Sequence, residues 1–331
     1  MPDNKRQHYV PQNYLREFSK DGTTIGVYLI ESDNFINEAP ISRQAQKPYF
    51  YSDNLELEKG LSEIEEITAK NRKSLFENTS QKLSLYQKEI LYQDMMLQLF
   101  RTKQMADKVE EFATANARTV WRHCSDKQIR ENADNFGIKY TYPIMPSLMV
   151  LLNNLTICIG LDFKILVNKT KLPFITSDAP VSKYNKFFEA CRINTTGLLN
   201  KGIILYYPLT PSHAVLYYDQ GTYKAKYRRR HYLEITDISD VYNLNGLTCA
   251  CASQCVYYHA GKIVGEHVQW IFNEIKEARQ PLMQVTEMPE TESSSLLFMN
   301  SPFPFLYTAL SFLKFQDKVK LLFQNKRVVK T

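Results

Sequence analysis

The 331-residue sequence predicts an α+β fold, with long N-terminal helices and C-terminal helices packed around one mainly antiparallel central sheet. Apolar residues with helical spacing dominate the first third of the chain, whereas short β-branched and aromatic segments gather in the middle. Strands and helices do not alternate regularly as in βαβ proteins, which argues against a parallel α/β sheet. Apolar residues make up 44% of the chain, enough for a sizeable core.

The N-terminal part is expected to be mainly helical. Pro11–Phe18 predicts a short helix, because proline suits a first helical turn, and Thr23–Glu31 predicts a strand. The segment from Ile41 to Ser52 is expected to be irregular. Leu55–Phe76 predicts a helix whose acidic first half suits the helix dipole. A long helix with room for one interruption is expected from Leu83 to His123.

The middle of the chain is expected to supply the sheet and the C-terminal part to supply further helices. Strands are predicted at Phe163–Val167, Leu172–Thr176, Gly202–Tyr207, Ala214–Tyr218 and Thr222–Tyr227. Helices are predicted at Ser147–Gly160, Ser239–Tyr258, Glu266–Arg279 and Leu306–Asn325. We therefore expect a single α+β domain over residues 1–285, followed over 286–331 by a linker and a basic C-terminal helix.

The positive charge of the chain is unevenly distributed. The net charge is +6, yet Tyr223–Tyr232 alone carries +5 and the segment from Ala309 to Thr331 carries another +5, so the remainder is about −4. Two basic patches on a mildly acidic body are suited to holding a polyanion, although solvated surface segments explain them equally well.

Membrane insertion is not expected. The uncharged stretch from Tyr140 to Leu161 is long enough to cross a bilayer, but Asn153-Asn154 interrupts its apolar part and Pro146 suits the start of a buried helix. The polar start of the chain has no apolar region typical of a secretory signal, so its six cysteines are expected to be reduced thiols. Together these features predict a bacterial-type cytoplasmic protein.

A set of short motifs resembles a known bacterial family, domain of unknown function 4238. The sharpest is His8-Tyr9-Val10-Pro11-Gln12, and Ala179 is a departure where the family is expected to have Asn more often. The resemblance implies kinship over roughly residues 8–260 and brings no established reaction. The other matching segments are Leu61-Ser-Glu-Ile-Glu65, Leu97-Gln98-Leu99-Phe100-Arg101-Thr102, Phe174-Ile-Thr-Ser-Asp-Ala-Pro-Val181, Tyr207-Pro208-Leu-Thr-Pro211 and Asn243-Leu-Asn245.

His8 is the first candidate for chemistry. It lies just outside the N-terminus of the predicted Pro11–Phe18 helix, a position that lowers the pKa of an imidazole and favours its neutral, basic form. Gln12 and Arg16 are four residues apart on that helix and share a face. We expect His8 to act as a general acid or base, with Gln12 and Arg16 orienting an anionic substrate. A capping or packing histidine is the structural alternative.

Two further polar groups are candidates for the same site. Asp94, Gln98 and Arg101 form a polar stripe on an otherwise apolar helix, where an amide and a guanidinium can hold a phosphate or carboxylate. Asp178 follows a predicted strand and precedes Ala179-Pro180, a rigid mount for a carboxylate that orients His8 or binds a metal. A salt bridge at the stripe and turn-amide binding by Asp178 are the alternatives.

A metal or other cofactor is not expected, with a divalent cation as the open alternative. Glu58 and Glu65 are seven residues apart on one helix face and could join Asp178 around such a cation. Cys251, Cys255 and His259 would have i, i+4 and i+8 spacing on a helix, but without a Cys-x-x-Cys knuckle they are better interpreted as core residues.

These features together favour a hydrolase that acts on a nucleic acid or nucleotide, of the phosphodiesterase or nuclease kind. In this hypothesis His8, Gln12, Gln98, Arg101 and Asp178 surround one catalytic pocket, and Arg16 and Arg228, Arg229 and Arg230 hold the substrate. A role as a bacterial toxin or phage-defence effector rests on analogy alone. The alternative is a non-catalytic module that binds a small anionic ligand or a protein partner.

Overall fold

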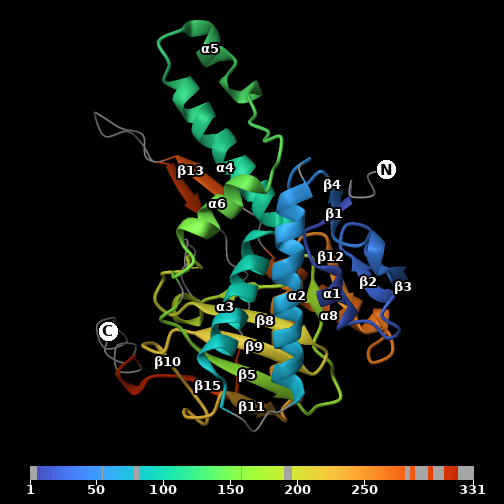
Figure 1. Cartoon of the computed structure of the whole chain (residues 1–331). Helices are drawn as coiled ribbons and strands as arrows, with labels where there is room; N and C mark the ends of the chain where they lie inside the picture. The colour runs from blue at the N-terminus through green and yellow to red at the C-terminus, as the bar shows by residue number, and fades with distance from the viewer. Residues whose placement is uncertain are drawn as a thin grey trace.

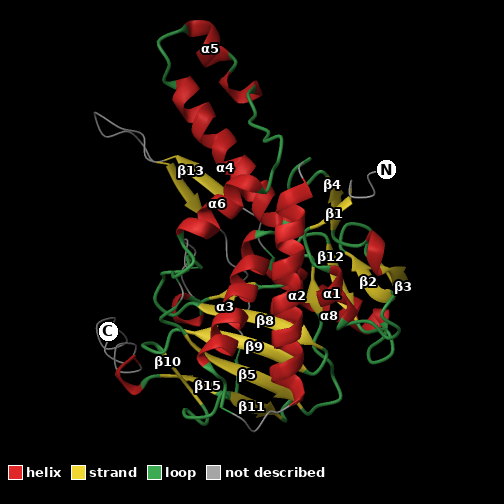
Figure 2. Cartoon of the chain, viewed as in Figure 1, coloured by secondary structure: helices red, strands yellow, loops and turns green. Residues whose placement is uncertain are grey.

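The computed structural model describes residues 6–53, 55–77, 82–157, 159–189, 196–279, 284–287, 297–300 and 309–319. It has the predicted α+β architecture, with sheets whose strands are mostly antiparallel (Figure 2). The strands divide over two principal sheets where one was expected. None of the helices in the described residues combines the length and apolar content needed to cross a bilayer.

A five-stranded sheet forms the centre of the molecule, in the order β11-β5-β9-β8-β7. Its only parallel pair within the described chain is β11 with β5. Alternate residues of its strands enter two different apolar cores, so both faces of the sheet are buried. The strands span Asp162–Asn168 (β5), Ser182–Tyr184 (β7), Ile204–Thr210 (β8), His213–Tyr218 (β9) and Tyr232–Ile235 (β11).

A four-stranded sheet, in the order β3-β2-β12-β6, lies beside the first and carries the N-terminal part of the chain (Figure 1). Its strands are Thr24–Leu29 (β2), Asn34–Pro40 (β3), Thr176–Ser177 (β6) and Cys255–Tyr258 (β12). The helices Ile238–Cys251 (α7) and Gly265–Ile275 (α8) pack on each other, α7 against β6 and β7 and α8 against β2 and β3.

A hairpin of two long helices covers one face of the five-stranded sheet. Its helices are Leu55–Glu77 (α2) and Leu85–Phe100 (α3), and Figure 1 shows them crossing β8, β9 and β5. Ser84 begins α3 with a capping box, because its hydroxyl accepts from the Gln87 amide and the Gln87 side chain accepts from the Ser84 amide. The expected interruption of the long helix falls at Arg101 and Thr102.

Thr102 starts a separate helix, Lys103–Arg122 (α4), by accepting a hydrogen bond from the Met105 amide. Together with Lys127–Glu131 (α5), α4 forms an arm that projects from the body (Figure 1). The remaining elements are β1 (Arg6–His8), α1 (Gln12–Arg16), β4 (Gln46–Pro48), α6 (Met145–Asn153), β10 (Tyr223–Ala225), β13 (Gln284–Glu287), β14 (Leu297–Asn300), β15 (Leu313–Phe315) and short 3-10 helices at Ile41–Arg43, Ala133–Asn135, Lys186–Phe188 and Lys276–Ala278.

Two predictions for the sheet were wrong. The predicted strand Phe163–Val167 lies within β5, but Leu172–Thr176 is not a strand of that sheet, because β6 begins only at Thr176 and joins the other sheet. The predicted helix Ser239–Tyr258 ends at Cys251, and the chain then turns into β12, between β2 and β6. The side chains of this segment alternate as a strand requires, because Val256 and Tyr258 enter one core and Tyr257 enters the other.

The predicted buried helix Ser147–Gly160 is shorter and more exposed than expected. It ends at Asn153. The side-chain amides of Asn153 and Asn154 donate to the backbone carbonyls of Met149 and Val150, and such bonds compete with the helix. Only one side of α6 is buried, and Met149 and Leu152 are 56% and 66% exposed.

The predicted final helix Leu306–Asn325 is wrong over residues 309–316, whereas residues 317–319 are helical. Leu313–Phe315 is a strand that pairs antiparallel with β10, and the ring of Phe315 stacks on that of Tyr223 with centroids 5.3 Å apart. The rest of that segment, apart from residues 309–319, lies outside the described residues, as does most of the predicted linker. The division of the chain after residue 285 stays a prediction.

Two ion pairs join α2 to α3. Nη1 of Arg72 lies 2.7 Å from Oδ2 of Asp94, and Nη2 of Arg101 lies 2.7 Å from Oε1 of Glu65. Glu65 and Arg72 of α2 are seven positions apart, as are Asp94 of α3 and Arg101, which directly follows α3. The acid comes first in both, so an antiparallel hairpin matches each acid to a base. Arg72 and Asp94 are each only 1% exposed, and Asp94 also accepts from the Tyr207 hydroxyl of β8 at 3.2 Å.

We expect Asp94→Asn to lower the free energy of unfolding by about 3–5 kcal/mol, because it leaves the buried Arg72 guanidinium without a countercharge. Replacing both residues, as Arg72→Met with Asp94→Leu, should cost less than Asp94→Asn alone. Urea unfolding measures both. The exposed pair of Glu66 with Lys70 is the control, and Glu66→Gln should cost less than about 1 kcal/mol. A loss for Asp94→Asn as small as this control would contradict the burial of the pair.

Candidate functional site

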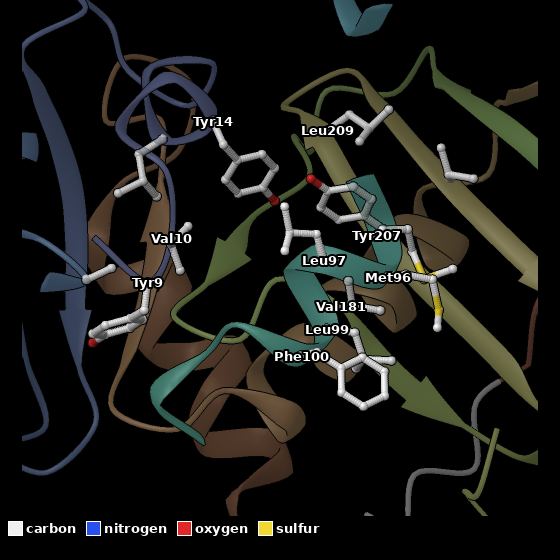
Figure 3. Close-up of a cluster of buried hydrophobic side chains, with 14 of the residues drawn as sticks. Tyr9, Val10, Tyr14, Met96, Leu97, Leu99, Phe100, Val181, Tyr207 and Leu209 are labelled. Atoms are coloured by element: carbon white, nitrogen blue, oxygen red, sulfur yellow. The ribbon is translucent and has the colours of Figure 1, made fainter. Parts of the chain in front are cut away.

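The sequence motifs meet at the N-terminal helix α1. The hydroxyl of Tyr14 lies 2.6 Å from Oγ1 of Thr176 and donates to the carbonyl of Pro208 at 2.6 Å, so one side chain ties α1 to both principal sheets. Its ring stacks on that of Tyr207, with centroids 5.5 Å apart (Figure 3). Asn245 completes the junction, since its amide contacts Pro173 and Ile175. These motif residues therefore hold the fold together.

A cavity of about 260 Å³ opens where α1, α2 and the end of α3 meet. It contains three of the five catalytic candidates, His8, Gln12 and Arg101, and the substrate-binding candidate Arg16. The other residues that line it are Asn13, Tyr51, Glu58, Leu61, Ser62 and Glu65. Two guanidinium groups, two carboxylates and an imidazole thus share one small space.

His8 is fixed in this cavity by both of its ring nitrogens. Nδ1 lies 3.0 Å from the carbonyl oxygen of Gln44, and Nε2 lies 3.0 Å from Nε2 of Gln12. A carbonyl needs a donor and an amide nitrogen offers one, so this arrangement requires a neutral ring with its proton on Nδ1. Burial lowers the pKa of His8 below its ordinary 6.5, with Arg101 and Arg16 acting in the same direction and the Gln44 carbonyl and Glu65 opposing it.

The sequence correctly predicted a lowered pKa for His8, but for a different reason. The expected cause was the N-terminus of the following helix, whereas the largest cause in the structure is burial. The helix itself has only five residues, Gln12–Arg16. Gln12 and Arg16 share a face as expected, with Nη2 of Arg16 at 3.4 Å from Oε1 of Gln12.

Arg101 connects the cavity to the backbone of His8. Its Nε donates to the Tyr51 hydroxyl at 2.9 Å, and its Nη2 donates to the His8 carbonyl at 2.9 Å as well as to Glu65. The Tyr51 hydroxyl donates to the same carbonyl at 2.8 Å. Burial acts to lower the pKa of Arg101, but Tyr51 and Glu65 outweigh it and raise the pKa, so the guanidinium stays charged. Its Nη1 has no hydrogen-bond partner among the described residues.

Asp178 and Gln98 are not among the residues that line this cavity. The buried carboxylate of Asp178 accepts from the Ser253 amide at 2.9 Å and the Gln254 amide at 2.8 Å, which closes the turn between α7 and β12. Burial raises the pKa of Asp178, and these amides oppose the shift. Gln98 is buried in α3, and its Oε1 has no partner within the described chain. The expected single pocket of five residues is therefore reduced to His8, Gln12 and Arg101.

The basic residues Arg229 and Arg230 line a different cavity, of about 760 Å³, which shares no lining residue with that of His8. In Figure 1, β11, which follows these arginines, lies far from β1 and β4. The cysteines are also dispersed, because Cys251 ends α7 and Cys255 belongs to β12, so the helical i, i+4, i+8 spacing with His259 does not exist. No group of three or more potential metal ligands occurs within the described ranges.

Sequence analysis missed the contacts that Glu65 and Tyr51 make in this cavity. Glu65 was considered only as a ligand in a cation site. The signal for its ion pair with Arg101 was the matching spacing, because Glu65 and Arg72 are seven residues apart, as are Asp94 and Arg101. No comparable signal existed for Tyr51. Its position depends on Gln7, whose side chain accepts from the Tyr51 amide at 2.6 Å and donates to the Ser52 carbonyl at 2.7 Å.

We expect Asp178→Asn to lower the free energy of unfolding by about 1–3 kcal/mol, because an amide NH2 must then face a backbone N–H in place of an acceptor. Chemical denaturation of the variant measures the loss. The cavity around His8 should keep its properties in the folded variant, since Asp178 does not line it. Unchanged stability would show that the turn at Ser253 and Gln254 does not need the carboxylate.

The comparisons with known proteins identify a family but do not indicate a reaction. No curated protein and no solved structure matches the chain. The sequence model of the family described as "Protein of unknown function (DUF4238)" matches residues 6–262. This range includes every element from β1 to β12 and both the His8 cavity and the Arg228–Arg230 segment. The chain therefore belongs to the DUF4238 family.

Proposed function

We propose that the protein is a hydrolase that acts on a phosphate ester of a nucleotide or of a nucleic-acid end, with the His8 cavity as its active site. The observation that carries this proposal is a neutral imidazole, oriented by the Gln44 carbonyl, in one cavity with two guanidinium groups. A neutral histidine can take a proton from an attacking water, and arginine can stabilise the charge that develops on a phosphate.

The atoms of the cavity support separate roles for its residues. Nε2 of His8 is the basic atom, because Nδ1 donates to Gln44. Water would reach Nε2 by replacing the amide of Gln12, which could then orient that water. The exposed guanidinium of Arg16 is the donor for the phosphate oxygens, and the buried guanidinium of Arg101 adds positive charge beside them. Glu65 is engaged in the ion pair with Arg101 and fixes that guanidinium.

The size of the cavity limits the substrate. Its volume of about 260 Å³ is below the roughly 300–1,000 Å³ typical of small-molecule sites, so it suits a phosphate with part of its sugar. A nucleotide or the end of a strand fits this description better than a phosphodiester inside a duplex.

The second candidate is a non-catalytic module that recognises a small anionic ligand. It is favoured by the contacts already made inside the cavity, where Gln12 occupies Nε2 of His8 and Arg101 binds Tyr51, Glu65 and the His8 carbonyl. Such a module would be stabilised by a nucleotide against thermal unfolding without converting it. A toxin or phage-defence role stays a hypothesis for either function.

We expect His8→Ala to reduce turnover by about 100- to 10,000-fold, the usual contribution of a positioned general base. His8→Asn should be as inactive as His8→Ala but more stable than it, because the asparagine amide can still donate to the Gln44 carbonyl. The assay follows phosphate release and strand shortening with nucleotides, RNA and single-stranded DNA, each with and without magnesium. His267→Ala, an exposed histidine of α8 outside the cavity, is the control and should keep full activity.

Turnover by His8→Ala equal to that of the parent, with a matching unfolding temperature, would remove His8 from the mechanism. Thermal stabilisation of the parent by a nucleotide that no preparation converts would instead favour the binding module. Loss of activity in His8→Ala together with loss of folding, but retention in His8→Asn, would show that His8 serves the structure.

A further inference from the structure

The segment Lys226–Arg230, here called the arginine loop, is an exposed turn whose backbone is held by hydrogen bonds. It connects β10 to β11, and all five of its side chains are exposed. Tyr227 has φ of 53°, an uncommon conformation for a bulky residue, and the Arg230 amide donates to the Tyr227 carbonyl at 2.9 Å. A tight turn is therefore maintained at a position where the sequence offers no glycine.

The side chain of Lys164, in β5, holds this turn by hydrogen bonds to its backbone. It is only 1% exposed, and its ammonium donates to the carbonyls of Arg230 at 2.6 Å, Tyr227 at 3.2 Å and Arg228 at 3.3 Å. A buried charge is costly unless it is well satisfied, and here three backbone acceptors of one loop satisfy it. The contact directs the loop carbonyls inward and leaves the arginine side chains at the surface.

The charges of the arginine loop are not neutralised. Arg228, Arg229 and Lys226 form no ion pair within the described part of the chain, while Arg230 stacks over the ring of Tyr227 at 5.8 Å. Tyr227 is 64% exposed. An aromatic face surrounded by guanidinium groups is the combination on which single-stranded nucleic acid binds, with bases on the ring and phosphates on the cations.

The cavity of about 760 Å³ beside the loop extends this basic surface. Lys82, Lys226, Arg229, Arg230 and His231 are among the residues that line it. Its volume is large enough for a nucleotide unit of a bound strand.

The acidic residues of this cavity are engaged in other contacts. Asp237 caps α7 by accepting from Ser239, and Asp240 accepts from the amide and hydroxyl of Ser311. Glu234 lies 3.6 Å from Lys169. The four Lys and Arg side chains that line the cavity outnumber its three carboxylates, each of which already has a partner.

We propose that the arginine loop and its cavity form a binding site for single-stranded nucleic acid, separate from the His8 cavity. Tyr227 stacks a base, Arg228 and Arg229 bind phosphates, and Lys164 keeps the loop in the conformation that presents them. The fixed backbone reduces the conformational entropy that binding would otherwise cost. This site does not depend on hydrolysis at His8, since the two cavities share no residue.

Binding is tested by fluorescence anisotropy with a short labelled oligouridylate, using the parent and the His8→Asn variant so that cleavage does not interfere. Arg228→Gln with Arg229→Gln and Arg230→Gln should weaken binding at least about tenfold. The slope of log affinity against log salt should fall by about 0.7 for each phosphate that the variant no longer binds. The matched control removes three exposed lysines elsewhere, Lys20→Gln with Lys59→Gln and Lys73→Gln, and should leave affinity and slope nearly unchanged.

Tyr227→Ala separates stacking from charge. It should weaken binding by about five- to 150-fold, the effect of removing one base–aromatic stack, with little change in salt slope. Equal affinity of the triple arginine variant and the lysine control would overturn the proposal. So would binding of phosphatidylserine vesicles without binding of the oligouridylate, or tighter binding of duplex than of single strand. His8→Asn should bind as the parent does, whether or not the parent hydrolyses anything.

Discussion

Two ion pairs, Arg72 with Asp94 and Glu65 with Arg101, set the register of the α2–α3 hairpin. The same charged residues also bind α1, the central sheet and β1. Asp94 binds Tyr207 of the central sheet, and Nη2 of Arg72 donates to Asn13 of α1 at 3.2 Å. A one-turn slip of either helix would leave at least one buried charge without a partner, at a cost of about 3–5 kcal/mol. The hairpin therefore places α1, the sheet and the N-terminal strand relative to one another.

The same pairs create the candidate site as a consequence of holding the fold. The Arg72 pair is sealed in the core, whereas the Arg101 pair lies at the end of the hairpin, where the Glu65 side chain is 21% exposed. Arg101 there meets the carbonyl of His8, so a structural guanidinium also positions the imidazole-bearing residue. The requirement that buried polar groups be satisfied explains why the motifs gather, while only those at the open end can reach a ligand.

Sequence reasoning succeeded where local chemistry decides the outcome. Helical periodicity identified α2 and α3. It failed where pairing partners distant in the chain decide. The strand Cys255–Tyr258 exists because β2 and β6 flank it, and the Gln44 carbonyl reaches His8 only through the pairing of β1 with β4. Asp178 was misplaced because the turn it stabilises lies 75 and 76 residues away.

His8 is held as a neutral base by the backbone carbonyl of Gln44. The most direct test is an NMR pH titration of histidine-labelled protein, with the His8 signal assigned from His8→Asn. We expect a His8 pKa below its ordinary 6.5 and a proton on Nδ1 in the neutral form. A His8 pKa at or above 6.5, or a neutral form protonated on Nε2, would contradict it.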